Sequence, residues 1–190
     1  MRENFHVIKT KHLTTTLYIQ AQAPSVQSVL MAEAAALTLA ANITKHLNIN
    51  SVTFLTDSQV MVNLYNSRDL ENPSHWNIKN DTTTFLQALQ TREFKVHKIP
   101  RNSNTTANSL AHQAFRSQSH SVVFTCTVPA HISYDSCPAA LALQNVNLEP
   151  FKLLTVYAVV KLMKHVIKKK ALPLRNIHQI RLHTTASTNN

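Results

Sequence analysis

The sequence predicts an α/β fold in which a mixed β-sheet is flanked by helices. Three segments carry this prediction. Residues 15–22 alternate apolar and polar side chains, residues 26–47 repeat apolar side chains at helical spacing, and residues 52–56 form a short apolar run typical of buried strands. Strands that alternate with helices along a chain are typical of layered α/β proteins.

Two strands are expected near the N-terminus, over residues 5–9 and 15–22. Three consecutive threonines precede or open the second strand, and such β-branched side chains favour extended backbone. Pro24 ends it, because proline lacks the N–H group that a sheet ladder needs. The helix over residues 26–47 follows, with a wide apolar face.

The next elements are bounded by capping and breaking residues. After the strand over residues 52–56, Asp57 and Ser58 form a capping pair for a helix that reaches about Asn66. A helix, a strand and a helix are then expected over residues 75–91, 94–99 and 104–118.

The C-terminal part is expected to be simpler. Residues 121–150 hold three prolines and no strong hydrophobic period, so we interpret them as a linker. From Phe151 to Leu172 we expect a basic amphipathic helix, which Pro173 ends. The residues expected on its apolar face are Val156, Val160, Met163 and Ile167. The predicted organisation is a domain over residues 1–120, a linker over 121–150, and the basic helix with a polar tail over 151–190.

The charge of the chain is concentrated in that C-terminal part. The chain carries 19 Lys and Arg against 9 Asp and Glu, a net charge of +10. No acidic residue follows Glu149, whereas eight basic ones do: Lys152, Lys161, Lys164, Lys168, Lys169, Lys170, Arg175 and Arg181. Such an excess favours an anionic partner.

Because no targeting signal is recognisable, we expect an intracellular protein, in the nucleus or cytoplasm. No apolar run is long enough for a transmembrane helix, and the N-terminal residues lack the apolar core of a signal peptide. We expect Cys126 and Cys137 to be free thiols rather than a disulfide.

Four short segments carry the functional argument. Residues 32–37 read Ala-Glu-Ala-Ala-Ala-Leu, residues 56–59 read Thr-Asp-Ser-Gln, and residues 107–111 read Ala-Asn-Ser-Leu-Ala. Residues 73–78 read Pro-Ser-His-Trp-Asn-Ile. Together they resemble the ribonuclease H type-1 family associated with plant reverse transcriptases, over about residues 5–120. The resemblance implies a ribonuclease H-like fold that here is N-terminally truncated, because the opening strand and its carboxylate are missing.

The resemblance also implies a chemistry. Family members cleave the RNA strand of an RNA–DNA hybrid with two Mg²⁺ or Mn²⁺ ions, held by four carboxylates. Glu33 and Asp57 match two of these, as catalytic residues and metal ligands. Asn108 occupies the position of a third, where an amide removes one negative charge. Taken alone, Glu33 is also explained by the helix dipole and Asp57 by capping.

Three further residues are predicted to bind nucleic acid. Arg101, in a polar loop, is either a phosphate contact or a solvated charge. Trp76 could stack on a sugar or base, although core packing is the more common role of such a ring. Ser58 is included because it lies beside Asp57 in the family motif.

The incomplete carboxylate set leaves several functions open. The protein is expected to bind RNA–DNA hybrid or RNA, with Mg²⁺- or Mn²⁺-dependent cleavage impaired or lost. One alternative is a non-catalytic nucleic-acid-binding module without any cofactor. A second is a basic helix that binds a protein groove or, less favoured, a membrane. A third is an eroded retroelement copy without function.

Overall fold

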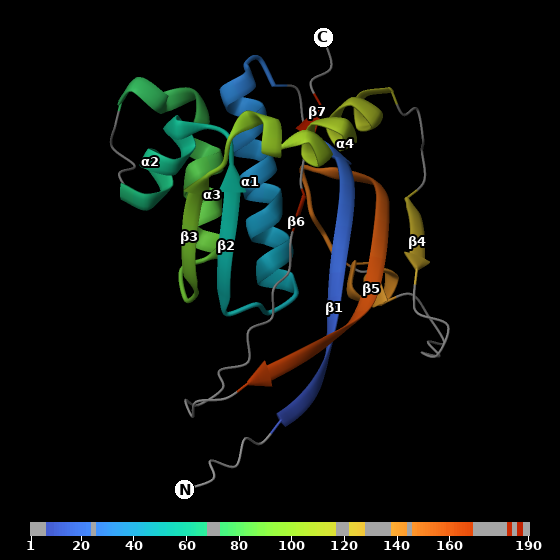
Figure 1. Cartoon of the computed structure of the whole chain (residues 1–190). Helices are drawn as coiled ribbons and strands as arrows, with labels where there is room; N and C mark the ends of the chain where they lie inside the picture. Colours follow the sequence, from blue (N-terminus) through green and yellow to red (C-terminus); the bar gives the residue numbers. More distant parts are fainter. Residues whose placement is uncertain are drawn as a thin grey trace, which may run out of the picture.

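The computed structural model describes residues 7–23, 26–67, 73–116, 122–127, 138–143, 146–168, 182–183 and 186–187. The strands are β1 (Val7–Gln22), β2 (Ser51–Thr56), β3 (Glu93–Lys98), β4 (Val123–Thr127), β5 (Lys152–Lys168), β6 (Leu182–His183) and β7 (Ala186–Ser187). The α-helices are α1 (Val29–His46), α2 (Gln59–Ser67), α3 (Lys79–Ala88), α4 (Thr105–Arg116) and α5 (Pro138–Leu143). Two short 3₁₀ helices are η1 (Pro73–Ile78) and η2 (Arg101–Ser103). The predicted mixed α/β class is confirmed (Figure 1).

The strands form two separate sheets within the described part of the chain. In the larger sheet, β1 pairs with β5 in antiparallel orientation along its whole length, and β4 extends the sheet beyond β5 in parallel orientation. The short strands β6 and β7 lie parallel on the other edge of β1. The smaller sheet is the parallel pair β2 and β3. Figure 1 shows the two sheets standing next to each other, with α4 crossing near their upper ends.

Helix α1 joins the two sheets because it buries residues on two sides. Ala34, Leu37 and Ala41, at helical spacing, pack in one core with the aromatic residues of β2, α2 and α3. Ala35, Leu39 and Ile43, on the adjacent face, pack in a second core with residues of β1 and β5. The two cores therefore share one helix as their common wall.

Aromatic rings fill the first core around a single residue. Phe85 of α3 is fully buried, and the rings of Phe54, Tyr65 and Phe94 lie within 5.4 Å of it between centroids. Such edge-to-face and tilted contacts are favourable arrangements for aromatic pairs. They fix α2 and α3 against β2 and β3, and β2 ends at the candidate site.

Two predicted element boundaries are wrong. Residues 7–9 and 15–22 of the two expected strands are parts of the one strand β1, because no turn residue interrupts the threonine-rich stretch between them. Residues 5–6 lie outside the described residues. The helix expected over residues 75–91 is the 3₁₀ helix η1 followed by α3, which ends at Ala88. The other helices and strands predicted between residues 26 and 118 lie close to their expected positions.

The predicted basic helix is also wrong, since residues 152–168 form strand β5. Leu154, Val156 and Ala158 are buried, whereas Thr155 and Tyr157 between them are half-buried on the other face, which is the period of a strand. The run is rich in β-branched residues, and pairing with β1 satisfies its backbone groups. Residues 169–172 of that expected helix lie outside the described residues.

The expected linker over residues 121–150 contains ordered elements as well. Strand β4 and helix α5 lie within it, and Leu143 and Leu148 are buried in the second core. Pro138 begins α5 and Pro150 lies just before β5, so these two prolines bound elements rather than exclude them. Most of the expected polar tail lies outside the described residues.

The state of one cysteine differs from expectation. Cys126 in β4 is disulfide-bonded, so the prediction of a free thiol is wrong for this residue. Cys137 lies outside the described residues.

None of the helices in the described part of the chain has the length and apolarity needed to cross a membrane.

Candidate functional site

Asp57 lies directly after β2 and is held by the loop that precedes α4. Nδ2 of Asn104 donates a hydrogen bond to Oδ1 of Asp57 at 3.0 Å. Nε of Arg101 lies 3.9 Å from Oδ2, with the Asp57 side chain 17% exposed and that of Arg101 89% exposed. Because a solvated ion pair stabilises little, the amide of Asn104 is the main fixed contact of this carboxylate.

Ser58, rather than Asp57, caps helix α2. Its backbone carbonyl accepts from the Val62 N–H at 3.2 Å, and its Oγ accepts from the Met61 N–H at 3.5 Å. The Ser58 N–H in turn donates to Oγ1 of Thr56 at 3.1 Å. The capping role predicted for Asp57 is therefore wrong, and its carboxylate instead faces Asn104.

Glu33 reaches the same place from α1, one turn into the helix. It is half-buried, and its carboxylate accepts a hydrogen bond from the Ser58 side chain. Burial raises the pKa of Glu33 above its ordinary value of 4.5, and the nearby Asp57 carboxylate acts in the same direction. The Ser58 hydrogen bond and the Arg101 charge oppose this shift.

The structure thus brings four of the predicted residues together. Glu33, Asp57 and Ser58 form a half-buried cluster, and Arg101 stands at its exposed rim. These side chains come from α1, the end of β2, the cap of α2 and η2. We name this group the carboxylate cluster.

Asn108, which was predicted in the place of a carboxylate, does not hold Asp57. It is exposed on α4, and its backbone N–H donates to the Asn104 carbonyl at 3.1 Å. The amide that reaches Asp57 belongs to Asn104, one turn earlier, which the sequence argument missed. The sequence marks Asn104 only as a typical N-cap directly before a helix, and this does not point to Asp57.

Trp76 is placed differently from the expectation of core packing. It lies in η1 and is 79% exposed, so its ring is not part of either core. Helix η1 packs against α1, the helix that carries Glu33. The ring is therefore open to solvent on an element next to the helix of the carboxylate cluster.

The donor set does not fit a two-metal site. No group of three or more His, Cys, Asp or Glu side chains able to hold a metal occurs among the residues that the structure describes. Mg²⁺ takes octahedral oxygen ligands, and two-ion cleavage needs carboxylates around both ions. Glu33 and Asp57 alone do not supply these, and Asn104 presents an N–H group to one of them.

The layered α/β fold, with carboxylates from α1 and from the end of β2, agrees with the ribonuclease H-like class that the four motifs predict. The sequence profile of the family described as reverse transcriptase-like matches residues 6–114, more than half of the chain. The chain therefore belongs to the reverse transcriptase-like family, which confirms the resemblance to a reverse-transcriptase-associated family. The association with plants stays a prediction.

One solved structure resembles the chain. It is the crystal structure of RNase H1 from the halophilic archaeon Halobacterium salinarum NRC-1, with a TM-score of 0.42 and 15% identity. The similarity covers 53% of this chain and 96% of that one. No curated protein is similar enough to the chain to count as a relative.

Proposed function

We propose that the chain is a ribonuclease H-like domain that binds RNA–DNA hybrid or RNA, and that its metal-dependent cleavage of hybrid is lost or strongly impaired. Family membership supports the binding. The observation that carries the loss of cleavage is the state of Asp57, whose carboxylate is held by a protein N–H donor of Asn104.

Three features of the carboxylate cluster act against metal binding. The Asn104 amide and the Arg101 guanidinium both direct N–H groups or positive charge at Asp57. The pKa of Glu33 is raised, so this carboxylate gives up its proton less readily than an ordinary one. The third matching position, Asn108, carries no charge. The Asn104 donor occupies a lone pair of Asp57, the Arg101 charge offsets part of its negative charge, and Asn108 contributes none, so the site attracts a divalent cation less than a full set of carboxylates would.

Binding nucleic acid requires no metal ligands, and two exposed side chains offer suitable groups, one at the rim of the cluster and one on η1, which packs against α1. Arg101 is an exposed cation at the rim, suited to a phosphate contact. Trp76 is an exposed ring, suited to stacking on a sugar or base. We assign phosphate contact to Arg101 and stacking to Trp76, with Ser58 holding Glu33 in place.

Fluorescence anisotropy with a labelled RNA–DNA hybrid at several salt concentrations tests this assignment. Arg101→Gln is expected to weaken binding and to reduce the salt slope by about 1, because one phosphate contact is lost. Trp76→Ala is expected to weaken binding about tenfold with the salt slope unchanged, because stacking releases no counterions.

Leu141→Ala is the matched control, since Leu141 is an exposed apolar residue on α5. Its binding curve is expected to match that of the unmodified protein. If the unmodified protein binds neither hybrid nor RNA at low salt, the proposal is wrong, and the eroded retroelement copy becomes the better explanation.

A further inference from the structure

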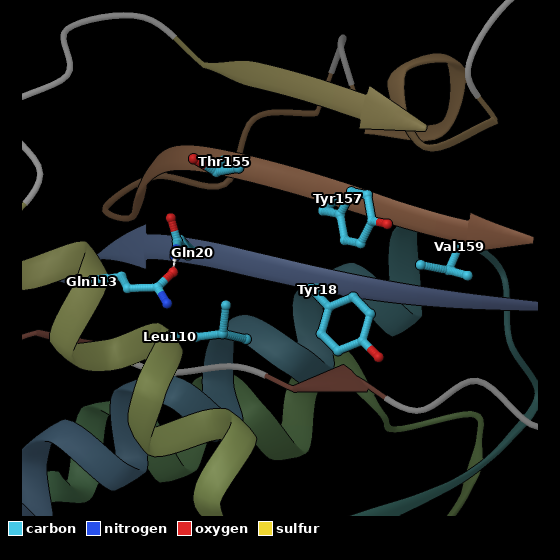
Figure 2. A pocket seen from close by; sticks show the side chains of 7 residues that line it. All are labelled: Tyr18, Gln20, Leu110, Gln113, Thr155, Tyr157 and Val159. Carbon is cyan, nitrogen blue, oxygen red and sulfur yellow. Dashed lines mark hydrogen bonds between the residues drawn. The ribbon is translucent and has the colours of Figure 1, made fainter. Parts of the chain in front are cut away.

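The face of the β1–β5 sheet that is turned away from α1 carries a pocket of about 510 Å³. Five strand residues line it: Tyr18, Gln20, Thr155, Tyr157 and Val159. They share one face because Tyr18 pairs with Tyr157 and Gln20 pairs with Thr155 across the two strands. Helix α4 closes one side with Leu110 and Gln113 (Figure 2). We name this site the sheet-face pocket.

The sheet-face pocket exists because only one face of these strands is filled by the second core. The alternate residues Ile19, Val156 and Ala158 are at most 1% exposed on the α1 side. On the opposite face α4 packs against β1. The pocket lies where the side chains of α4 do not cover the sheet. Its size falls in the range of ligand sites in proteins.

Two tyrosine rings form the floor of the pocket. The rings of Tyr18 and Tyr157 are stacked with centroids 5.8 Å apart and planes inclined by 27°. The hydroxyl of Tyr157 lies 3.0 Å from Oγ1 of Thr127 in β4, which anchors that ring at its outer end. A flat, anchored aromatic platform is the feature on which nucleobases stack.

An amide pair forms one wall. Nε2 of Gln20 donates to Oε1 of Gln113 at 2.7 Å, as Figure 2 shows, and Nε2 of Gln113 donates to Oγ of Ser109 at 3.3 Å. Because each amide nitrogen has two hydrogens and each amide oxygen two lone pairs, both side chains keep hydrogen-bonding capacity. Amide groups of this kind pair with the edges of bases.

The charges beside the pocket fit a nucleotide rather than a cationic or peptide ligand. None of the seven lining residues is acidic. Arg116 is exposed one turn beyond Gln113, on the same side of α4. Lys152 is exposed and pairs with Gln22, two residues after Gln20 and so on the pocket face. Two elements that line the pocket, α4 and β5, thus each carry an exposed cation that can serve as a phosphate partner.

Helix α4 connects the pocket to the carboxylate cluster. Asn104, directly before the helix, contacts Asp57, and Gln113 lines the pocket. Thr105 to Gln113 spans about 12 Å at the helical rise per residue. At roughly 3.4 Å per nucleotide along one strand, this corresponds to about four nucleotides.

We propose that the sheet-face pocket binds an unpaired nucleobase of a nucleic-acid strand that extends about four nucleotides beyond a duplex lying at the carboxylate cluster. The base stacks on the Tyr18–Tyr157 platform, and Arg116 and Lys152 contact the flanking phosphates. This inference rests on the proposed function, namely that the chain binds nucleic acid.

The test compares three kinds of labelled probe by fluorescence anisotropy with the full chain. The first is a blunt RNA–DNA hybrid. The second is the same hybrid with a single-stranded overhang of six nucleotides, placed on one end or on the other. The third is each of these overhang hybrids with the overhang made abasic. The hybrid with bases in one overhang is expected to bind about tenfold more tightly than its abasic counterpart. Tyr157→Leu is expected to remove this difference, whereas Tyr157→Phe keeps the ring and retains it.

Arg116→Gln provides an independent readout. It is expected to weaken binding of base-bearing and abasic overhangs equally and to reduce the salt slope by about 1, because it removes a phosphate contact. Thermal unfolding of every variant checks that the fold is intact, and Tyr18→Leu, which removes the other ring of the platform, tests the stacking if Tyr157→Leu does not fold.

The possible failures are distinguishable. If the blunt hybrid binds but bases in the overhang add nothing, the inference about the pocket is overturned while the proposed function stands. If no probe binds, both are overturned. If a phosphate-free peptide bearing phenylalanine binds in a Tyr157-dependent manner and overhang bases do not, the pocket belongs to a protein partner and the inference is likewise wrong.

Discussion

At the scale of single residues, Asn104 holds the carboxylate of Asp57 in place by a hydrogen bond. Its side chain donates to Asp57 at 3.0 Å, and its carbonyl accepts from the Asn108 N–H at 3.1 Å at the start of α4. One residue thus connects the end of β2 to the beginning of α4. The Asn104 donor occupies a lone pair of Asp57 that a metal ion would use, which is the contact on which the proposed loss of cleavage rests.

Asn104→Ala is expected to lower the free energy of unfolding by about 1–2 kcal/mol, because it removes a hydrogen bond to a charged group. Urea unfolding measures this loss. Asn102→Ala, an exposed asparagine of the same loop, is expected to cost under about 0.5 kcal/mol. In a double-mutant cycle with Asp57→Ala the two losses should not add, and full additivity would show that the contact does not exist in solution.

Glu33 is expected to make stability depend on pH in a defined direction. Burial raises its folded-state pKa above 4.5, so the folded protein binds this proton more tightly than the unfolded chain does. The resulting stabilisation is present at low pH and is lost as the pH rises from about 4.5 through the folded-state pKa.

Glu33→Gln cannot ionise, so we expect it to be at least as stable as the unmodified protein at pH 7 and to lose less stability between pH 4.5 and 7. Urea midpoints at the two pH values measure this difference. Glu93→Gln, which removes an exposed carboxylate on β3, is the matched control. A variant Glu33→Gln that is clearly less stable at pH 7 would contradict the direction of the shift.

The residues of the candidate site were only partly predictable. Glu33 and Asp57 were identified because each lies in a short motif that survives in the sequence. The contact between Asn104 and Asp57 joins residues 47 positions apart, so only the fold reveals it. The exposure of Trp76 was missed because a lone tryptophan is more often packed than exposed.

At the scale of elements, β5 changes the interpretation of the C-terminal part. Val156, Val160, Met163 and Ile167 happen to recur at helical spacing within a sequence that forms a strand. The β-branched content and the alternation from Leu154 to Ala158 were the better indicators. A bulge after Gln20 shifts the register and places Leu153 opposite Ala21, which obscures the alternation.

Single alanine substitutions distinguish the strand from a helix. Leu154 is fully buried in the structure, and Leu154→Ala is expected to cost about 2–5 kcal/mol. In the helix first predicted, Leu154 would lie about 200° from Val156 and therefore on the solvated face, where the cost would be small. Thr155→Ala, on the pocket face, is the control and should cost under about 1 kcal/mol. Urea unfolding decides between the two.

The strand also removes the support for one alternative function. A basic amphipathic helix that binds a membrane or a protein groove requires residues 152–168 to be helical, and they pair with β1 instead. Elements between residues 26 and 118 were predicted well because strong periodicity is bounded there by Asn, Ser and Pro. Elements held mainly by distant pairing, such as β4 and β5, carry a weaker local signal, and in β5 the helical recurrence of four apolar residues obscured it.

At the scale of the whole molecule, α1 links two sheets that do not pair with each other in the described residues. One core fixes β2 and the carboxylate cluster, and the other fixes β1, β5 and the sheet-face pocket. Helix α4 spans from Asp57 to the pocket. This arrangement favours a continuous nucleic-acid surface from the cluster to the pocket, without requiring a working metal site.

Incubation of an end-labelled RNA–DNA hybrid with the purified full chain, in Mg²⁺ and separately in Mn²⁺, tests the central claim most directly. Product fragments are resolved on a denaturing gel, with anisotropy confirming that the hybrid is bound. The account predicts bound but intact RNA in both metals. Cleavage that disappears in Asp57→Ala would contradict it, because a working metal site would then survive in the carboxylate cluster.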